Sequence, residues 1–258
     1  MTDILVSDFI TGLFIFLRIS GMIFTAPVFS SRNFPTMAKI LLSLIITYIL
    51  FFLVEEHQFN YDQGLVLLAM TGVKEVITGM IIGFVVQFVF YAINYAGMLI
   101  GFDLGLGMAM AFDANTEVNT NLMGQVMNTF ALLIFVLING HHYLIRAIGF
   151  SFEVIPLGEY VIKEDVINTL ILYSASIFIL AVKMASPIIV SFFLLHIASG
   201  IMARINPQMN VFFVIHPLKM GMGFALISLI APVYVYIMRN LLENYENKLF
   251  EIVQELGK

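Results

Sequence analysis

The sequence contains no cysteine and few charged residues. Of its 258 residues, 11% are Asp, Glu, Lys or Arg, whereas 60% are hydrophobic. The absence of cysteine excludes disulfides and thiolate chemistry, although it says nothing about the cellular compartment. The scarcity of charge excludes intrinsic disorder and argues against a soluble globular fold, because soluble domains are typically about 45–50% apolar.

Enzyme and nucleic-acid signals are also missing. The formal net charge is −5 and there is no block of basic residues, which argues against a nucleic acid partner. The sequence has no G-x-S-x-G, no Walker loop and no GxGxxG. The adjacent His141 and His142 face different sides of a helix, and His57, His196 and His216 are isolated, so we expect packing or helix-end roles for them. We therefore expect no enzyme activity, no cofactor and no metal site.

Long uncharged runs are present instead. The runs 76–101, 118–145, 184–203 and 220–238 each reach the roughly 20 residues that a helix needs to cross the hydrocarbon core of a membrane. The first apolar run, 9–29, has no basic segment before it and no small-residue cleavage site, so we expect it to stay on the chain as structure. The sequence therefore predicts an integral membrane protein.

The fold class predicted from these runs is all-α. They are rich in Leu, Ile, Phe and Val without strict alternation, and in lipid only helices or closed barrels satisfy the backbone. About six helical regions are expected: 9–29, 37–54, 64–101, 122–149, 166–203 and 208–238. Residues 1–238 would form the membrane-embedded part. In 239–258 an apolar stripe at helical spacing predicts a separate amphipathic helix on the membrane surface or on a partner. The stripe is Leu241, Leu242, Tyr245, Leu249, Ile252 and Val253.

Two of the predicted regions are too long for a simple span. Regions 64–101 and 166–203 would each run about 57 Å, against a hydrocarbon core of about 30 Å. They must break, tilt or extend beyond the bilayer, and Ser186-Pro187 offers a kink in the second. The Lys and Arg residues of the loops give no clean orientation. Either the six-span count is wrong, or assembly with other subunits sets the final position.

Charged residues also lie inside the predicted helical regions, and we single out Arg18, Lys74, Glu75, Lys183 and Lys219. Each costs about a few kcal/mol where it faces lipid, so we expect each to face protein or water. For Lys74, Glu75 and Lys219, a structural buried ion pair or a charge that extends to the membrane surface is the simpler interpretation. Arg18 and Lys183 have no acidic neighbour within a turn. They need partners from elsewhere in this chain or from another chain.

The stretch GFDLGLGMAMAFDANTEVN, residues 101–119, interrupts the apolar runs with glycines, methionines and a polar acidic end. Composition alone favours an ordinary loop between two membrane helices. A secondary transporter for a small solute would use this stretch as a discontinuous helix, with Arg18 or Lys183 in its site, but we find no inverted repeat between the halves. A membrane-embedded enzyme would need a convergent polar constellation that the His and Asp positions do not supply.

Four blocks of the sequence resemble the FliR family, the export-gate subunit of flagellar and related type III secretion systems. The blocks are RISGMIFTAPVFSSRNFP, AGMLIGFDLGLGMAMAFDA, NGHHYLIRAIGFSFEVIPLG and ARINPQMNVFFVIHPLKMGMG. They occur in order between residues 18 and 223. The clearest departure is Ala114, where the family usually has Pro after the Asp.

The resemblance implies a core subunit of a passive conduit in the bacterial inner membrane, at the centre of the flagellar basal body. FliP- and FliQ-type subunits would form the conduit with it, next to an FlhB-type subunit, and unfolded export substrates would pass through. Long helical hairpins would assemble with these partners, and buried charges would pair between subunits.

The central segment, at about 101–121, would be a plug that closes this conduit. Its glycines would supply bends, its Met and Phe residues a soft apolar obstruction that repacks around irregular shapes, and its acidic end a return to water. These residues are Gly101, Gly105, Gly107, Met108, Met110, Phe112 and Asp113.

Overall fold

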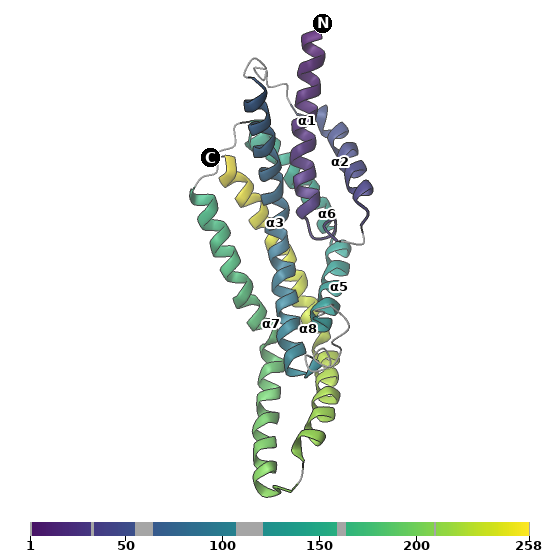
Figure 1. Ribbon diagram of the computed structural model, residues 1–258, viewed down its shortest axis with the longest axis vertical. Helices are drawn as coiled ribbons and strands as arrows, with labels where there is room; N and C mark the ends of the chain where they lie inside the picture. The colour runs from purple at the N-terminus through teal and green to yellow at the C-terminus, as the bar shows by residue number, and fades with distance from the viewer. Residues whose placement is uncertain are drawn as a thin grey trace. The chain divides into compact units, whose positions relative to one another are not determined.

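The computed structural model describes residues 2–31, 34–54, 64–106, 121–158, 164–208 and 210–257 (Figure 1). Within these ranges it has α-helices and no β-strand, which confirms the all-α fold class. The helices are α1 (Thr2–Thr25), α2 (Thr36–Phe51), α3 (Leu65–Asp103), α5 (Leu122–Leu137), α6 (Gly140–Val154), α7 (Glu164–Ile205) and α8 (Val211–Gly257).

Four of these helices are long and apolar enough to cross a membrane, and α5 with α6 makes a fifth candidate if the two form one broken span. Helices α3, α7 and α8 contain 39, 42 and 47 residues. At a rise of 1.5 Å per residue these lengths are about 58, 63 and 70 Å, well beyond a hydrocarbon core of about 30 Å. The prediction of a helical membrane protein with overlong helices is confirmed.

The predicted helix 122–149 is two helices in the structure. Helix α5 ends at Leu137 and α6 begins at Gly140, and between them Asn139 adopts the left-handed conformation with φ 60° and ψ 30°. Asn is one of the few residues other than Gly that visit this region routinely, because its short side chain forms local hydrogen bonds. The prediction of one helix here is wrong because the Asn-Gly pair outweighs the apolar pattern around it.

The other long regions are not broken. Helix α3 is continuous from Leu65 to Asp103 despite its glycines, and α7 continues through Pro187. Helix α8 contains Pro217 and Pro232 and also includes the C-terminal segment, which we expected to be separate. These helices are therefore continuous, and each is longer than a bilayer is thick.

The chain forms two compact units, each built from segments that are distant in the sequence. Unit 1 comprises Met1–Val89, Phe135–Ser174 and Leu242–Lys258. Within it, α1 packs against α2, and the first half of α3 lies beside α1 (Figure 1). Side chains of α1, α3, α6 and the end of α8 form its core, among them Ile15, Ile19, Ile82, Leu144, Ala147 and Val253.

The C-terminal end of α8 packs within unit 1. In its predicted apolar stripe, Leu242, Tyr245, Leu249, Ile252 and Val253 are buried and Leu241 is half-buried. The ring of Phe250 contacts Phe150 of α6 with 5.7 Å between centroids, and the ammonium of Lys248 lies 4.8 Å from the ring centroid of Tyr173 in α7. The expectation that this stripe lies on the membrane surface or on a partner is wrong, because the chain itself covers it.

Unit 2 comprises Phe90–Ile134 and Ala175–Leu241. In its first segment, the side-chain amide of Asn121 donates to the carbonyl oxygen of Asn94 at 3.1 Å, and its oxygen accepts from the N–H of Gly124 at 2.9 Å. A Cβ added at Gly97 would collide with the backbone of Gly124. The end of α3 and the start of α5 are therefore in close backbone contact, as small residues allow.

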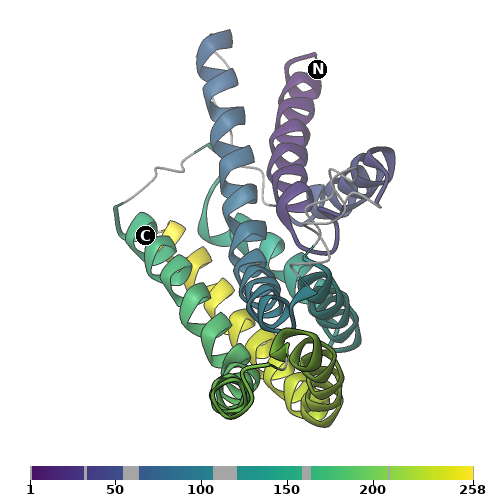
Figure 2. The ribbon, with the colours of Figure 1, turned by 60° about the horizontal axis from the view of Figure 1, so that its bottom comes forward.

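The second segment of unit 2 is a long antiparallel hairpin. It consists of α7 from Ala175 onward and α8 up to Leu241, and its turn faces the viewer at the bottom of Figure 2. The hydroxyl of Tyr234 donates a hydrogen bond to the carbonyl oxygen of Met184 at 3.0 Å. The two helices are thus joined within a surface that is otherwise mostly apolar.

Candidate functional site

Arg18 lies in the core of unit 1 and its side chain is completely buried. Its Nε donates to Glu75 Oε2 at 2.5 Å, which forms an ion pair between α1 and α3. Its Nη1 donates to the carbonyl oxygens of Ser151 and Ile155, at 3.0 Å each. These carbonyls lie at the C-terminal end of α6, where the helix dipole favours a positive charge.

The carboxylate of Glu75 extends the network to the turn after α6. Its Oε1 accepts a hydrogen bond from the N–H of Gly158 at 2.8 Å, and Gly158 has a positive φ of 83° that glycine adopts without strain. The guanidinium carbon of Arg18 lies 4.4 Å from the ring centroid of Phe152, a favourable cation–π contact. One ion pair therefore connects α1, α3, α6 and the turn that leads to α7.

Glycines allow α1 to come close enough to α3 for this ion pair to form. A Cβ added at Gly79 would collide with the carbonyl oxygen of Arg18, and one added at Gly21 would collide with that of Val76. Gly83 is similarly enclosed by the backbone at the end of α1. Backbone atoms cannot move aside as the end of a flexible side chain can, so these positions require glycine.

The five charged residues predicted to face protein or water have different surroundings in the structure. It brings Arg18 to Glu75, so Arg18 has a polar partner elsewhere in the chain. Lys74 is half-buried and forms no ion pair with any described residue, so the ion pair of Glu75 is with Arg18 and not with Lys74. Lys183 is exposed on α7, and the half-buried Lys219 donates to His196 Nε2.

The burial of Arg18 also bears on the small-solute transporter that sequence analysis left open. No part of its side chain is accessible, and its Nε and Nη1 donate to Glu75 and to the end of α6. A solute could not reach the guanidinium without displacing α6. Arg18 is therefore unsuited to a transport site and suited to holding helices together.

The predicted plug begins in the described residues and continues outside them. Gly101 lies inside α3 rather than at a bend, and a Cβ added there would lie 3.3 Å from the Cβ of Met123. The chain turns at Gly105, whose φ of 78° favours glycine. The other predicted plug residues, Gly107, Met108, Met110, Phe112 and Asp113, lie outside the described residues, as does Ala114.

Polar side chains surround the point where α3 ends in unit 2. Asp103, the last residue of α3, interacts electrostatically with His196 of α7 and Lys219 of α8. A Cβ at Gly105 would collide with the ring of His216, so α8 approaches the turn closely. The start of the predicted plug is thus held between the two helices of the hairpin.

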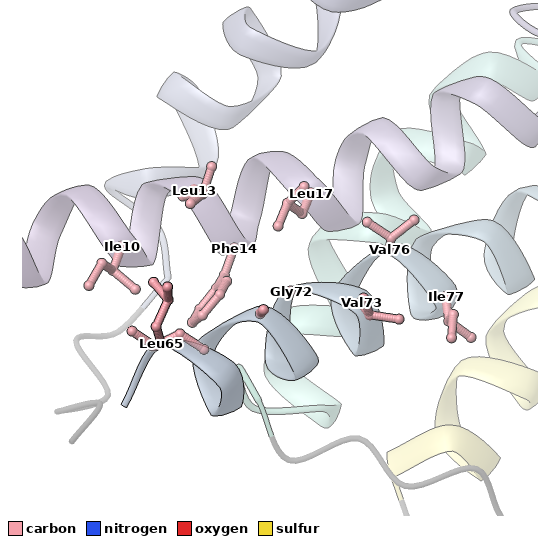
Figure 3. A pocket seen from close by; sticks show the side chains of 11 residues that line it. Ile10, Leu13, Phe14, Leu17, Leu65, Gly72, Val73, Val76 and Ile77 are labelled. Carbon is pink, nitrogen blue, oxygen red and sulfur yellow. The ribbon is translucent and has the colours of Figure 1, made fainter. Parts of the chain in front are cut away.

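An apolar groove of about 600 Å³ lies between α1 and α3 in unit 1 (Figure 3). Side chains of Ile10, Phe14 and Leu17 line it from α1, and residues of α3 from Leu65 to Ile77 line it from the other side. Gly72 leaves room at its floor, where an added Cβ would lie 3.0 Å from the end of Leu17. The groove carries no charged or hydrogen-bonding side chain, so it offers no site for a polar solute.

Together these features define a helical integral membrane protein whose buried polar groups join its own helices. A family described as bacterial export proteins, family 1, matches residues 9–245. The flagellar biosynthetic protein FliR of Bacillus subtilis is 31% identical over 232 residues, 88% of each chain. FliR of Escherichia coli is 28% identical over 240 residues, 93% of this chain and 91% of its own. FliR of Caulobacter vibrioides is 27% identical over 215 residues.

The chain therefore belongs to the FliR family of bacterial export proteins. It is a membrane component of flagellar protein export.

The acceptors at the end of α6 could not be predicted from the sequence. Nothing in the sequence marks the backbone carbonyls of Ser151 and Ile155 as partners of Arg18, because every residue has a carbonyl. A signal for Glu75 was available, since it is the only carboxylate within the predicted regions 9–29, 37–54 and 64–101. Counting charges of opposite sign across helices would have made Arg18 a candidate partner of Glu75, alongside Lys39 and Lys74.

Proposed function

We propose that this chain is a core subunit of the flagellar export gate. With FliP- and FliQ-type subunits it forms a closed conduit for unfolded export substrates, in the bacterial inner membrane at the flagellar basal body and next to an FlhB-type subunit. The segment at about 101–121 plugs the conduit until a substrate passes.

The observation that carries this proposal is the extent of exposed apolar surface on helices that are longer than a bilayer. In the most apolar stretches of α7 and α8, only 28% and 11% of the residues are buried. Lipid covers about 30 Å of a helix, whereas α7 and α8 extend for about 63 and 70 Å. Such surface is characteristic of a subunit that is completed by other proteins.

Two features support the plug. Within the segment the chain leaves α3 and turns at Gly105, and this turn lies beside His216 of the α7–α8 hairpin. Its Met-rich sequence suits a seal that opens and re-forms, because an unbranched thioether side chain adapts to irregular shapes.

The proposal is tested by co-expression. The chain, carrying an affinity tag, is produced alone or together with the FliP- and FliQ-type proteins of the same genome and purified in a mild detergent. We expect a monodisperse complex of all three proteins and a poor yield of aggregated chain without the partners. The proposal would be contradicted if the chain produced alone were as abundant and monodisperse as the co-expressed chain, and if no partner co-purified after co-expression.

A further inference from the structure

The α7–α8 hairpin of unit 2 carries positive charges and no negative charge. Residues 166–242 contain no Asp or Glu, but they include Lys183, Arg204, Lys219 and Arg239. The net charge of the whole chain is nevertheless −5. The acidic residues are therefore concentrated elsewhere, and this hairpin is an apolar surface whose fixed charges are all of one sign.

Lys183 lies on one exposed face of α7, one turn from the first residue of that face. Residues three or four positions apart share a face of a helix. The members of this face, which we call the Lys183 face, are all exposed: Ile179, Lys183, Pro187, Val190, Leu194, Ile197, Ile201 and Ile205. The opposite side of α7 is buried: Ala181, Met184, Ala185, Ile188 and Phe192. The ammonium group is thus presented away from its own unit.

The ammonium of Lys183 has no ion pair and no hydrogen bond with any residue that the structure describes. Lys219, by comparison, contacts His196 and lies near Asp103. A lysine on an apolar helix faces a partner or a water-filled space rather than lipid, because hydrocarbon does not solvate the charge. Lys183 therefore lacks the partner that its surroundings require.

Lipid alone does not account for this face. From Ile179 to Ile205 its exposed side chains extend over about 39 Å, more than the roughly 30 Å of hydrocarbon along an upright helix. Apolar residues continue on both sides of Lys183, so the lysine does not mark the end of the apolar surface. Another helix can cover such a stripe along its whole length.

A second copy of this chain is a poor occupant. Two α7–α8 hairpins packed face to face would bring lysines together without any carboxylate, since the hairpin contains none. Like charges that meet in an interface are repulsive and exclude the wrong partner. Charge complementarity selects a different chain with a carboxylate in an apolar helix.

We propose that the Lys183 face docks an apolar membrane helix of a non-identical subunit, and that an Asp or Glu of that helix pairs with Lys183. This inference rests on the proposed function, because it requires an assembly with other subunits. The stripe from Ile179 to Ile205 provides the apolar contact, and Lys183 fixes the register of the incoming helix. A single buried polar pair is suited to setting register in an otherwise uniform apolar interface.

The first experiment is site-specific photo-crosslinking in cells that express the complete export apparatus. A photoreactive residue is placed at Val190 or Ile197 on the Lys183 face, or at Ile188 on the buried side as the matched control. We expect cross-links from the exposed positions to an apolar helix of another subunit that contains a carboxylate, and none to another subunit from Ile188. Cross-links only to lipid, or only to a second copy of this chain, would overturn the inference.

The second experiment exchanges charges. Lys183→Glu is expected to reduce co-purification of the cross-linked subunit by at least about tenfold, because it places two buried carboxylates next to each other. Lys183→Arg keeps the positive charge and is expected to retain co-purification. Changing the carboxylate nearest the cross-link to Lys is expected to restore the complex with Lys183→Glu. Unchanged co-purification with Lys183→Glu would overturn the inference while leaving the proposed function intact. Failure of the unaltered chain to bind FliP- and FliQ-type subunits would overturn both.

Discussion

Arg18 Nε lies 2.5 Å from Glu75 Oε2, although the two residues are 57 positions apart in the sequence, and both side chains are completely buried. Neither group reaches water, so each compensates the charge of the other in an apolar interior. The ion pair behaves as one structural element that joins α1 to α3 and holds the end of α6 beside them.

The first prediction concerns this pair. Arg18→Met or Glu75→Gln alone is expected to lower the free energy of unfolding by about 3–5 kcal/mol, because each leaves a buried charge without its partner. The double substitution Arg18→Met/Glu75→Met is expected to cost clearly less than the sum of the Arg18→Met and Glu75→Met losses. Denaturant unfolding of the chain in the detergent-purified complex measures this cycle, with Lys74→Met as the control for loss of a lysine without an ion pair. Additive effects would contradict the coupling.

The second prediction concerns the close approach of α1 and α3. Gly79→Ala is expected to destabilise unit 1, since the new Cβ would collide with the carbonyl oxygen of Arg18. Gly200→Ala is the matched control, because Gly200 is also helical but has no atom within 4 Å of the added Cβ. There the substitution is expected to be neutral or stabilising by up to about 1 kcal/mol, the difference in helix propensity. Thermal unfolding of the two variants in the same detergent compares them, and equal midpoints would contradict the prediction.

The third prediction concerns the C-terminal end of α8. Leu249→Ala is expected to lower the free energy of unfolding by about 2–5 kcal/mol, because it leaves a cavity among buried side chains. Glu251→Ala, at an exposed position two residues away, is the control and is expected to change stability little. Denaturant unfolding distinguishes the two variants. If the segment bound only a membrane surface, Leu249→Ala would instead weaken lipid binding and leave unfolding unchanged.

The fourth prediction concerns the plug. Deleting Leu106 to Phe112 is expected to leave the complex assembled, since a connecting segment buries little core, but to make the membrane permeable to ions or small solutes. Met108→Asp is expected to loosen the seal as well, because an unpaired charge in a dry constriction draws in water. Met108→Leu is the control that keeps the apolar volume. The measurement is ion conductance, or uptake of a small toxic solute, in cells that contain the assembled complex. A deletion variant that assembles and stays as tight as the unaltered protein would show that the segment is only a loop.

The sequence was sufficient to predict the helices but not all of their ends. Long uncharged runs with few breaks predict membrane helices because lipid leaves the backbone few alternatives. The interruption at Asn139 was missed, since one residue in a left-handed conformation divides a helix without changing the apolar pattern on either side. The sequence also does not show that α7 continues through Pro187, because neighbouring groups can compensate for the hydrogen bond that proline removes.

The candidate site was predictable as a list of residues but not as a geometry. The cost of burying a charge identified Arg18 as a residue that needs a partner, and the structure supplies Glu75. The carbonyls at the end of α6 and the N–H of Gly158 are backbone groups, so no side-chain pattern marks them. The apolar stripe near Leu249 is visible in the sequence, but its amphipathic spacing is the same whether it faces lipid, a partner or its own chain.

The composition of unit 1 has a consequence for biosynthesis. Its last segment, Leu242–Lys258, leaves the ribosome after every helix of unit 2, yet its side chains complete the same core as α1 and α6. Chains usually fold from the N-terminus as they emerge, at about 5–20 residues per second. Unit 1 instead is completed only once Leu242–Lys258 has been synthesised, and the surface around Tyr173 and Phe150 is uncovered until then. Chains that are stalled or truncated before Leu242 therefore expose apolar surface that the last segment of unit 1 otherwise covers.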